Sequence, residues 1–211
     1  MRKQFFWLLV WGVAFAYIEA SVVVYLRALY YPHGFAFPVV IAETRMVITE
    51  LFRELATVII IWAAASLSYE RLQSRAAAFF MMFGIWDIFY YVFLKILLDW
   101  PESFSTWDLL FLLPLPWAGP VWAPVLVSIG IIYAGVVVLS HNAEGRFLLF
   151  DRRFIIMETV SAAVIILSFL LPGYSVITET VPTSFPWYLF WAGFVTGVAV
   201  FLYQMQEGRQ Q

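Results

Sequence analysis

The chain has 211 residues, of which 64% are hydrophobic and only 12% are charged, with a formal net charge of −2. Its mean hydropathy of +0.87 excludes a soluble globular protein, in which about a quarter of the residues are charged, because a core of this size could not hide so much apolar surface. The small net charge and the lack of a basic run argue against nucleic acid as a partner. The absence of Cys excludes disulfides and thiolate metal sites.

The first apolar segment extends from about Phe5 to Leu29, which exceeds the roughly 20 residues that a helix needs to cross a bilayer. A cleaved signal peptide is the alternative, since the chain begins with Met1-Arg2-Lys3. The apolar run is longer than the usual signal-peptide core of about 7 to 15 residues, however. We therefore predict a retained helix with Glu19 just beyond its midpoint and Arg27 near its outer end, where a long side chain can reach the interface.

The second apolar segment, from about Phe37 to Ser66, is unusual because it contains five ionisable side chains. At about 100° per helical residue, Glu43, Glu50 and Glu54 fall within a narrow arc, and Arg53 lies on its flank. A charge at the bilayer centre costs roughly 2.5 to 3.5 kcal/mol on insertion scales, so such residues usually face the interior of a bundle and mark a functional pathway. This polar stripe is the predicted centre of the protein.

The third apolar segment, from about Ala76 to Leu98, has Asp87 at its middle. Tyr90 and Tyr91 follow Asp87 closely and offer hydroxyl partners, and Lys95 lies nearer the outer end of the segment. This span therefore adds another intramembrane acid to those of its neighbour.

The connection from Asp99 to Pro120 is the longest in the chain. Ser105 or Thr106 is suited to cap a short helix over Leu109 to Leu113, which the following prolines would end. Such a helix is too brief to span, so we predict that it lies at the interface or re-enters the membrane.

Three more apolar segments complete the chain, at about Val121 to Leu139, Phe154 to Leu171 and Trp187 to Tyr203. With six spans, eight basic residues fall on one side of the membrane: Arg2, Lys3, Arg71, Arg75, Arg146, Arg152, Arg153 and Arg209. The positive-inside rule then places both termini in the cytoplasm. The predicted fold is an all-α polytopic membrane protein of the bacterial inner membrane, forming one integral membrane domain over residues 1–211.

Counting from the span ends places five charged side chains from three successive helices near the bilayer midplane: Glu19, Glu50, Arg53, Glu54 and Asp87. Four residues are predicted to support this cluster: Glu43, Tyr90, Tyr91 and Lys95. Four acids face one base in the cluster, so some carboxyl groups must be protonated or a cation must be bound. The alternative is a structural role, in which the charges only pin the second helix against its neighbours.

Three classes of function fit these features. A proton- or cation-conducting unit is supported by the excess of acids over bases. An accessory subunit of a larger membrane complex is supported by the small size of the chain, its high aromatic content and its Pro-rich outer connection. These two classes rank first. An intramembrane enzyme with a carboxylate-rich metal or acid/base site is the alternative. His33 and His141 fall on opposite sides of the membrane, so they cannot jointly bind one haem. No cofactor or metal is assigned, and the expected partners are the lipid bilayer and other membrane subunits.

Overall fold

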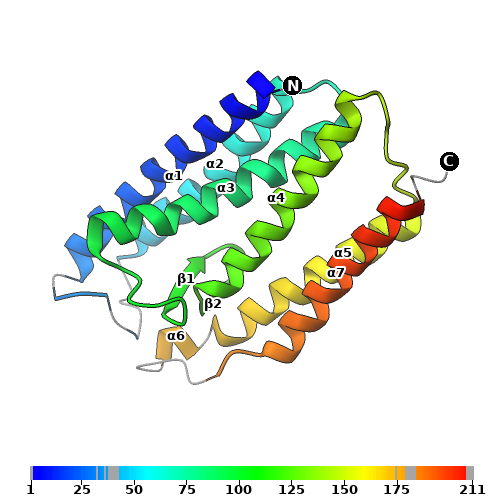
Figure 1. Ribbon diagram of the computed structural model, residues 1–211. Coiled ribbons are helices and arrows are strands. Elements are labelled where there is room, and N and C mark those ends of the chain that lie inside the picture. Colours follow the sequence, from blue (N-terminus) through cyan, green and yellow to red (C-terminus); the bar gives the residue numbers. More distant parts are fainter. Residues whose placement is uncertain are drawn as a thin grey trace.

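The computed structural model describes residues 2–31, 33–35, 37, 43–173, 175–178 and 184–207. The long helices are α1 (Arg2–Tyr30), α2 (Thr44–Ser68), α3 (Leu72–Leu98), α4 (Trp122–Ala143), α5 (Arg152–Leu170) and α7 (Trp187–Glu207). The short elements are β1 (Trp107–Phe111), β2 (Trp117–Pro120), η1 (Leu171–Gly173) and α6 (Ser175–Thr178). Figure 1 shows the long helices running along a common direction, with the start of α1 and the end of α7 toward the same end of the molecule.

In the part of the chain that the structure describes, five helices are long and apolar enough to cross a membrane: α1, α3, α4, α5 continued by η1, and α7. The fold is therefore that of a helical integral membrane protein. The helix α2 has a similar length of 25 residues, but Glu50, Arg53 and Glu54 lie in its first half. It begins at Thr44 rather than near Phe37, and residues 38–42 of the predicted second segment lie outside the described ranges, as does Arg209.

The helix α3 is the centre of the bundle and packs against α1, α2 and α4. Two glycines let α3 and α4 approach closely. A Cβ atom on Gly135 would lie 2.6 Å from the carbonyl oxygen of Ala77, and one on Gly84 would lie 2.7 Å from the carbonyl oxygen of Ser128. Helices in membranes associate largely through such close packing of small residues, because lipid offers no hydrophobic driving force between them. The position of α4 against α3 is therefore tightly fixed.

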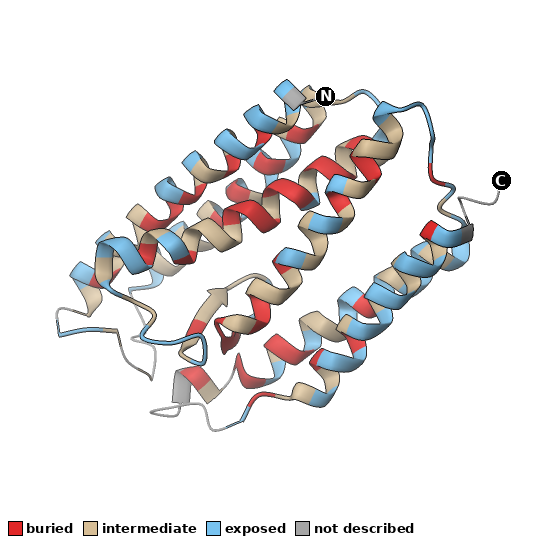
Figure 2. Cartoon of the chain, in the orientation of Figure 1, coloured by how far each residue is buried: buried red, intermediate tan, exposed pale blue. Residues whose placement is uncertain are grey.

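The helices α5 and α7 form a second pair, which packs mainly on itself. Within this pair the Ser161 hydroxyl donates a hydrogen bond to the Gly193 carbonyl at 2.6 Å. Near the hairpin, Phe169 and Phe190 are buried in a small apolar cluster that joins this pair to α4. Figure 2 shows that α5 and α7 are exposed along much of their length whereas α3 is largely buried, so this pair presents much of its apolar surface on the outside of the bundle.

The connection between α3 and α4 forms a β-hairpin, and the predicted short helix over Leu109 to Leu113 is wrong. β1 pairs antiparallel with β2, with Asp108 opposite Gly119. Five residues are too few for a stable helix, and Pro114 and Pro116 favour extended backbone in the residue before each of them. Pairing the two strands also satisfies backbone groups that would otherwise be unbonded near lipid. The fold is thus mostly helical with one small sheet.

Candidate functional site

A cavity of about 390 Å³ lies between α1, α2, α3 and the hairpin, and its volume is typical of sites that bind small molecules. Seven charged side chains line it: Glu19, Arg27, Glu50, Arg53, Glu54, Asp87 and Asp108. They come from three helices and the strand β1. Five are acids and two are arginines, so the cavity carries an excess of negative charge when all of them are ionised.

Arg53 connects the two helices that border the cavity on one side. Its Nε atom donates to Glu50 Oε2 at 2.9 Å within α2, and its Nη1 atom pairs with Glu19 of α1. The helices α1 and α2 each pack more closely on α3 than on each other. The ion pair between Arg53 and Glu19 is therefore a main link between them, and it neutralises much of the charge of both acids.

Glu54 binds the backbone of the hairpin and forms no ion pair with a basic side chain in the described structure. Its carboxylate accepts hydrogen bonds from the backbone N–H of Leu112 at 2.9 and 3.0 Å and from that of Leu113 at 3.2 Å. These residues directly follow β1, where the backbone donors are not paired within the sheet. The Glu54 side chain thus fixes the hairpin that covers the cavity to α2, and it forms no ion pair within the described ranges.

Asp87 makes its contact on the opposite side of the cavity. Its Oδ2 atom accepts a hydrogen bond from the Ser128 hydroxyl of α4 at 2.8 Å, and Ser128 is almost completely buried. Asp87 has no ion-pair partner within the described ranges. A carboxylate in this position keeps unused lone pairs that can accept hydrogen bonds from a ligand.

Arg27 and Asp108 form the outer part of the cavity wall. The Nη2 atom of Arg27 lies 3.6 Å from Asp108 Oδ1, and its guanidinium lies 3.7 Å from the ring centroid of Trp100 and 4.5 Å from that of Phe35. Burial raises the pKa of Asp108 to about 6, although the neighbouring Arg27 guanidinium lowers it. Arg27 is thus held by one acid and two aromatic rings.

The five side chains predicted to form the central cluster all line this cavity. They do not form one hydrogen-bonded group, because Arg53 takes Glu19 and Glu50 while Glu54 and Asp87 bind other partners. Among the predicted supporting residues, Tyr90 and Tyr91 also line the cavity.

Two of the predicted supporting residues lie elsewhere. Glu43 is exposed and precedes the first turn of α2, with φ −50° and ψ 138°. Lys95 is exposed and pairs with Asp99 at 2.7 Å. The residues that line the cavity therefore come from a narrower stretch of α2 and α3 than the sequence suggested.

Sequence reasoning missed Asp108 and Ser128 and gave Arg27 only an interfacial position. A partial signal for Asp108 was available, since two short and mostly apolar runs with prolines between them, Trp107–Phe111 and Trp117–Pro120, fit a hairpin as well as a short helix. The partners of Arg27 and Asp87 had no such signal, because both contacts join residues far apart in the chain.

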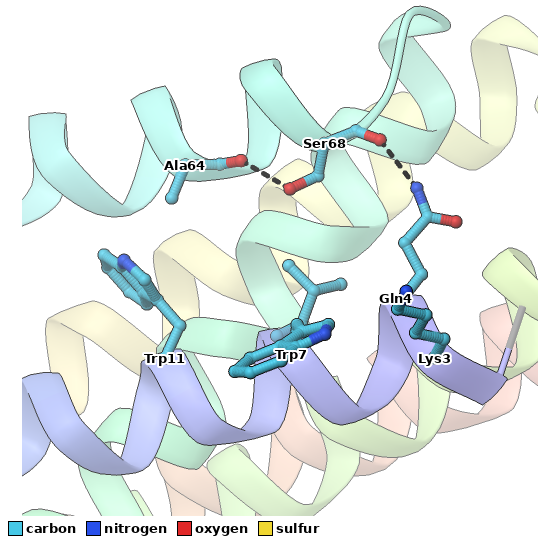
Figure 3. Close-up of a pocket in the computed structure, with 7 residues that line it drawn as sticks. Lys3, Gln4, Trp7, Trp11, Ala64 and Ser68 are labelled. Carbon is cyan, nitrogen blue, oxygen red and sulfur yellow. Dashed lines mark hydrogen bonds between the residues drawn. The ribbon is translucent and has the colours of Figure 1, made fainter.

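A second cavity of about 470 Å³ lies between α1 and α2 near the start of α1. Figure 3 shows Trp7 and Trp11 on α1 beside Ala64 on α2, and the Gln4 side chain reaching the Ser68 carbonyl. Among the described residues that line this second cavity, Lys3 is the only charged one. Along the two helices, the buried Ala16 and Ile61 lie between this groove and the charged cavity, so apolar packing separates the two.

Within the described ranges, no group of three or more His, Asp or Glu side chains is placed to hold a metal ion. No model of a known protein family, no curated protein and no solved structure matches this chain. The fold and the cavity define the class: a helical integral membrane protein with charged side chains buried inside its bundle.

Proposed function

We propose that this protein binds a cation, or exchanges protons, in the charged cavity, as a cation-handling unit of the membrane. The supporting observation is that Glu54 and Asp87 line the cavity with no basic partner in the described structure. The arginines cannot serve them, since Arg53 is paired with two acids and Arg27 with Asp108. A buried carboxylate without a counter-charge is costly, and a bound cation or a proton removes this cost.

The proposal includes six membrane spans with α2 as the second. At 1.5 Å per residue α2 is about 37 Å long, which is enough to cross a hydrocarbon core of about 30 Å. Its charged side chains line the cavity instead of facing lipid. Basic residues gather in the first turns of α1, α3 and α5 and in the links before α3 and α5, among them Lys3, Arg71, Arg75, Arg146, Arg152 and Arg153. This bias supports cytoplasmic termini, with the hairpin and the cavity toward the outer side.

The chain has no Cys, so this topology can be tested with single cysteines. We expect Ser105→Cys, next to β1, to react with a membrane-impermeant thiol reagent from the outside of cells. We expect Glu144→Cys, after α4, to react with the same reagent only when the membrane is permeabilised and the reagent reaches its cytoplasmic face. The opposite pattern for either position would contradict the proposed orientation.

The geometry supports a binding step more directly than an open channel. Ala16, Ile61 and Ala65 are completely buried and close the bundle on the inner side of the cavity. Conduction, one of the roles predicted from the sequence, therefore requires a second conformation in which this packing opens. The catalytic alternative, with Glu54 and Asp87 as acid and base, stays a prediction that the geometry does not test.

A second proposed role, as a subunit of a larger membrane complex, is supported by the pair α5 and α7. Large apolar side chains such as Ile155, Val160, Tyr188 and Val195 are exposed along it, and a carboxylate oxygen of Glu158 is buried there with no hydrogen-bond partner among the described residues. A partner helix could cover this surface. Extraction in a mild detergent followed by native mass spectrometry would test this role, and a single chain with bound lipid alone would argue against it.

Cation binding is tested most directly on the purified protein in neutral detergent. We expect at least one cation to cause a saturable change in Trp fluorescence, since Trp86 lines the cavity. We also expect binding of this cation to release protons, which can be measured in weakly buffered solution. The double variant Glu54→Gln/Asp87→Asn should lose both signals. The matched control is Glu158→Gln, which also removes an acid from a spanning helix but does not line the cavity. Identical titrations of the wild type and the double variant would overturn the proposal.

A further inference from the structure

We infer that the cation bound in the charged cavity is an organic ammonium ion that also carries a hydrogen-bond acceptor, such as a hydroxyl oxygen. This inference rests on the proposed function and specifies its ligand. Three independent features of the cavity lead to it: the way its acids are already engaged, the aromatic side chains in its wall, and the buried polar atoms that lack a partner.

The arrangement of the acids does not suit a bare inorganic ion. A hard cation such as Ca²⁺ needs six to eight oxygen ligands at short distance. Both oxygens of Glu54 already accept backbone N–H groups, and one oxygen of Asp87 accepts the Ser128 hydroxyl. The two carboxylates bind different elements of the fold, so each can offer a remaining lone pair to a ligand but cannot enclose an ion. A cavity of about 390 Å³ is also far larger than a bare ion requires.

Aromatic side chains make the wall suitable for an organic cation. Tyr30, Trp86, Tyr90 and Phe111 line the cavity together with the acids. Aromatic faces attract Lys, Arg and ammonium ligands electrostatically, the more so where water is excluded. Arg27 provides an example in this protein, because its guanidinium lies against the rings of Phe35 and Trp100. A ligand cation deeper in the cavity would meet the same combination of aromatic rings and carboxylates.

The third feature is a set of buried polar atoms on three lining residues that have no hydrogen-bond partner of normal geometry in the described part of the chain: Trp86 Nε1, Tyr91 Oη and Asp108 Oδ2. Their residues are only 5%, 6% and 2% exposed, respectively. The Tyr91 hydroxyl lies close to Asp108 without a hydrogen bond of normal geometry. The Trp86 N–H can only donate, and an ammonium group cannot accept from it. The ligand must therefore carry an acceptor oxygen beside its ammonium group.

An ammonium group with a neighbouring oxygen occurs both in free amino alcohols and in the head groups of phospholipids. The excess of acids over arginines in the cavity disfavours a phosphate next to the ammonium group. We therefore assign the ligand to the class of free amines with a hydroxyl or ether oxygen, and phosphorylated amines should bind more weakly.

The experiment compares four probes by calorimetric titration of the full chain in maltoside micelles at constant ionic strength: ethanolammonium, ethylammonium, phosphoethanolamine and K⁺. We expect ethanolammonium to bind at least tenfold more tightly than K⁺ or phosphoethanolamine. Glu54→Gln and Asp87→Asn should each weaken it roughly tenfold or more, as expected for the loss of a charged hydrogen-bond partner. Both substitutions keep an acceptor oxygen for the hairpin or for Ser128, so the fold should persist. Glu158→Gln should bind like the wild type.

Trp86→Phe supplies the specific test of the acceptor oxygen. It should bring the affinity for ethanolammonium down to that for ethylammonium, since the difference between these probes is one hydroxyl group. Binding of K⁺ or protons alone would overturn this inference and leave the proposed function intact. Failure of every cation to bind would overturn both, and tightest binding of phosphoethanolamine would overturn the assignment to free amines.

Discussion

Both carboxylate oxygens of Glu54 accept a hydrogen bond from the backbone N–H of Leu112, at 3.0 and 2.9 Å. Hydrogen bonds to an ionised acceptor are about twice as strong as those between neutral groups. This contact joins a membrane helix to a hairpin 58 residues further along the chain. The hairpin that covers the cavity is therefore held in place by Glu54, one of the acids that line the cavity.

Glu54→Ala should therefore loosen the hairpin. The substitution leaves the N–H groups of Leu112 and Leu113 without their acceptor, which should lower the free energy of unfolding by about 1.5 to 3 kcal/mol. Amide hydrogen exchange at these two residues should rise, and the thermal unfolding temperature in detergent should fall. Thr49→Ala is the control, because it removes only a local bond to Arg45 on the exposed side of the same helix. Unchanged exchange at Leu112 would contradict the role of Glu54.

Arg53→Met should be more damaging than the loss of a surface arginine. It leaves Glu19 and Glu50 without their counter-charge in the interior, and breaking one side of a buried ion pair typically costs about 3 to 5 kcal/mol. Arg45→Met, on the exposed first turn of α2, should have little effect. The double variant Arg53→Met/Glu19→Gln should regain part of the lost stability. If Arg53→Met and Arg45→Met had the same melting temperature, Arg53 would not be the link between α1 and α2.

Asp108 should make stability depend on pH in a defined direction. Its pKa in the folded protein, about 6, lies above the ordinary value of 3.8 for a free aspartate, mainly because of burial. The folded state therefore binds this proton more tightly than the unfolded state, so stability falls as pH rises from about 4 to about 6 and then levels off. The difference in melting temperature between the wild type and Asp108→Asn, measured from pH 4 to pH 8, should follow this curve. A constant difference over that range would contradict it.

Two glycines on α4 should respond oppositely to alanine. A Cβ atom at position 135 would lie 2.6 Å from the Ala77 carbonyl oxygen, so Gly135→Ala must push α3 and α4 apart. We expect this to lower the free energy of unfolding by about 1 to 3 kcal/mol. At Gly130 the nearest atom, on the Phe194 ring, is 3.5 Å away, which is an ordinary contact. Gly130→Ala should be neutral or stabilising, by up to about 1 kcal/mol of helix propensity. Thermal unfolding of both variants provides the comparison, and equal losses would refute the close packing.

The sequence alone determined the class of this protein and much of its fold. Length, apolar content and the spacing of apolar runs predict membrane helices, because a bilayer of fixed thickness demands about 20 apolar residues per span. The residues Glu19, Glu50, Glu54 and Asp87 also stood out from the sequence, since charges are rare inside such spans. The hairpin was missed because a short run of five apolar residues fits a strand and a buried helix equally well.

Only the tertiary structure decided which partner each charged side chain has. Helical periodicity assigns a residue to a face of its own helix, but it does not say which element meets that face. Glu54 binds hairpin backbone, Asp87 binds Ser128 of α4, and Arg27 binds Asp108, all across more than 40 residues of chain. Within the described ranges, these contacts leave Glu54 and Asp87 on the cavity wall without an ion-pair partner. Their physical cause is the packing of α1, α2 and α4 around α3, which no local pattern in the sequence encodes.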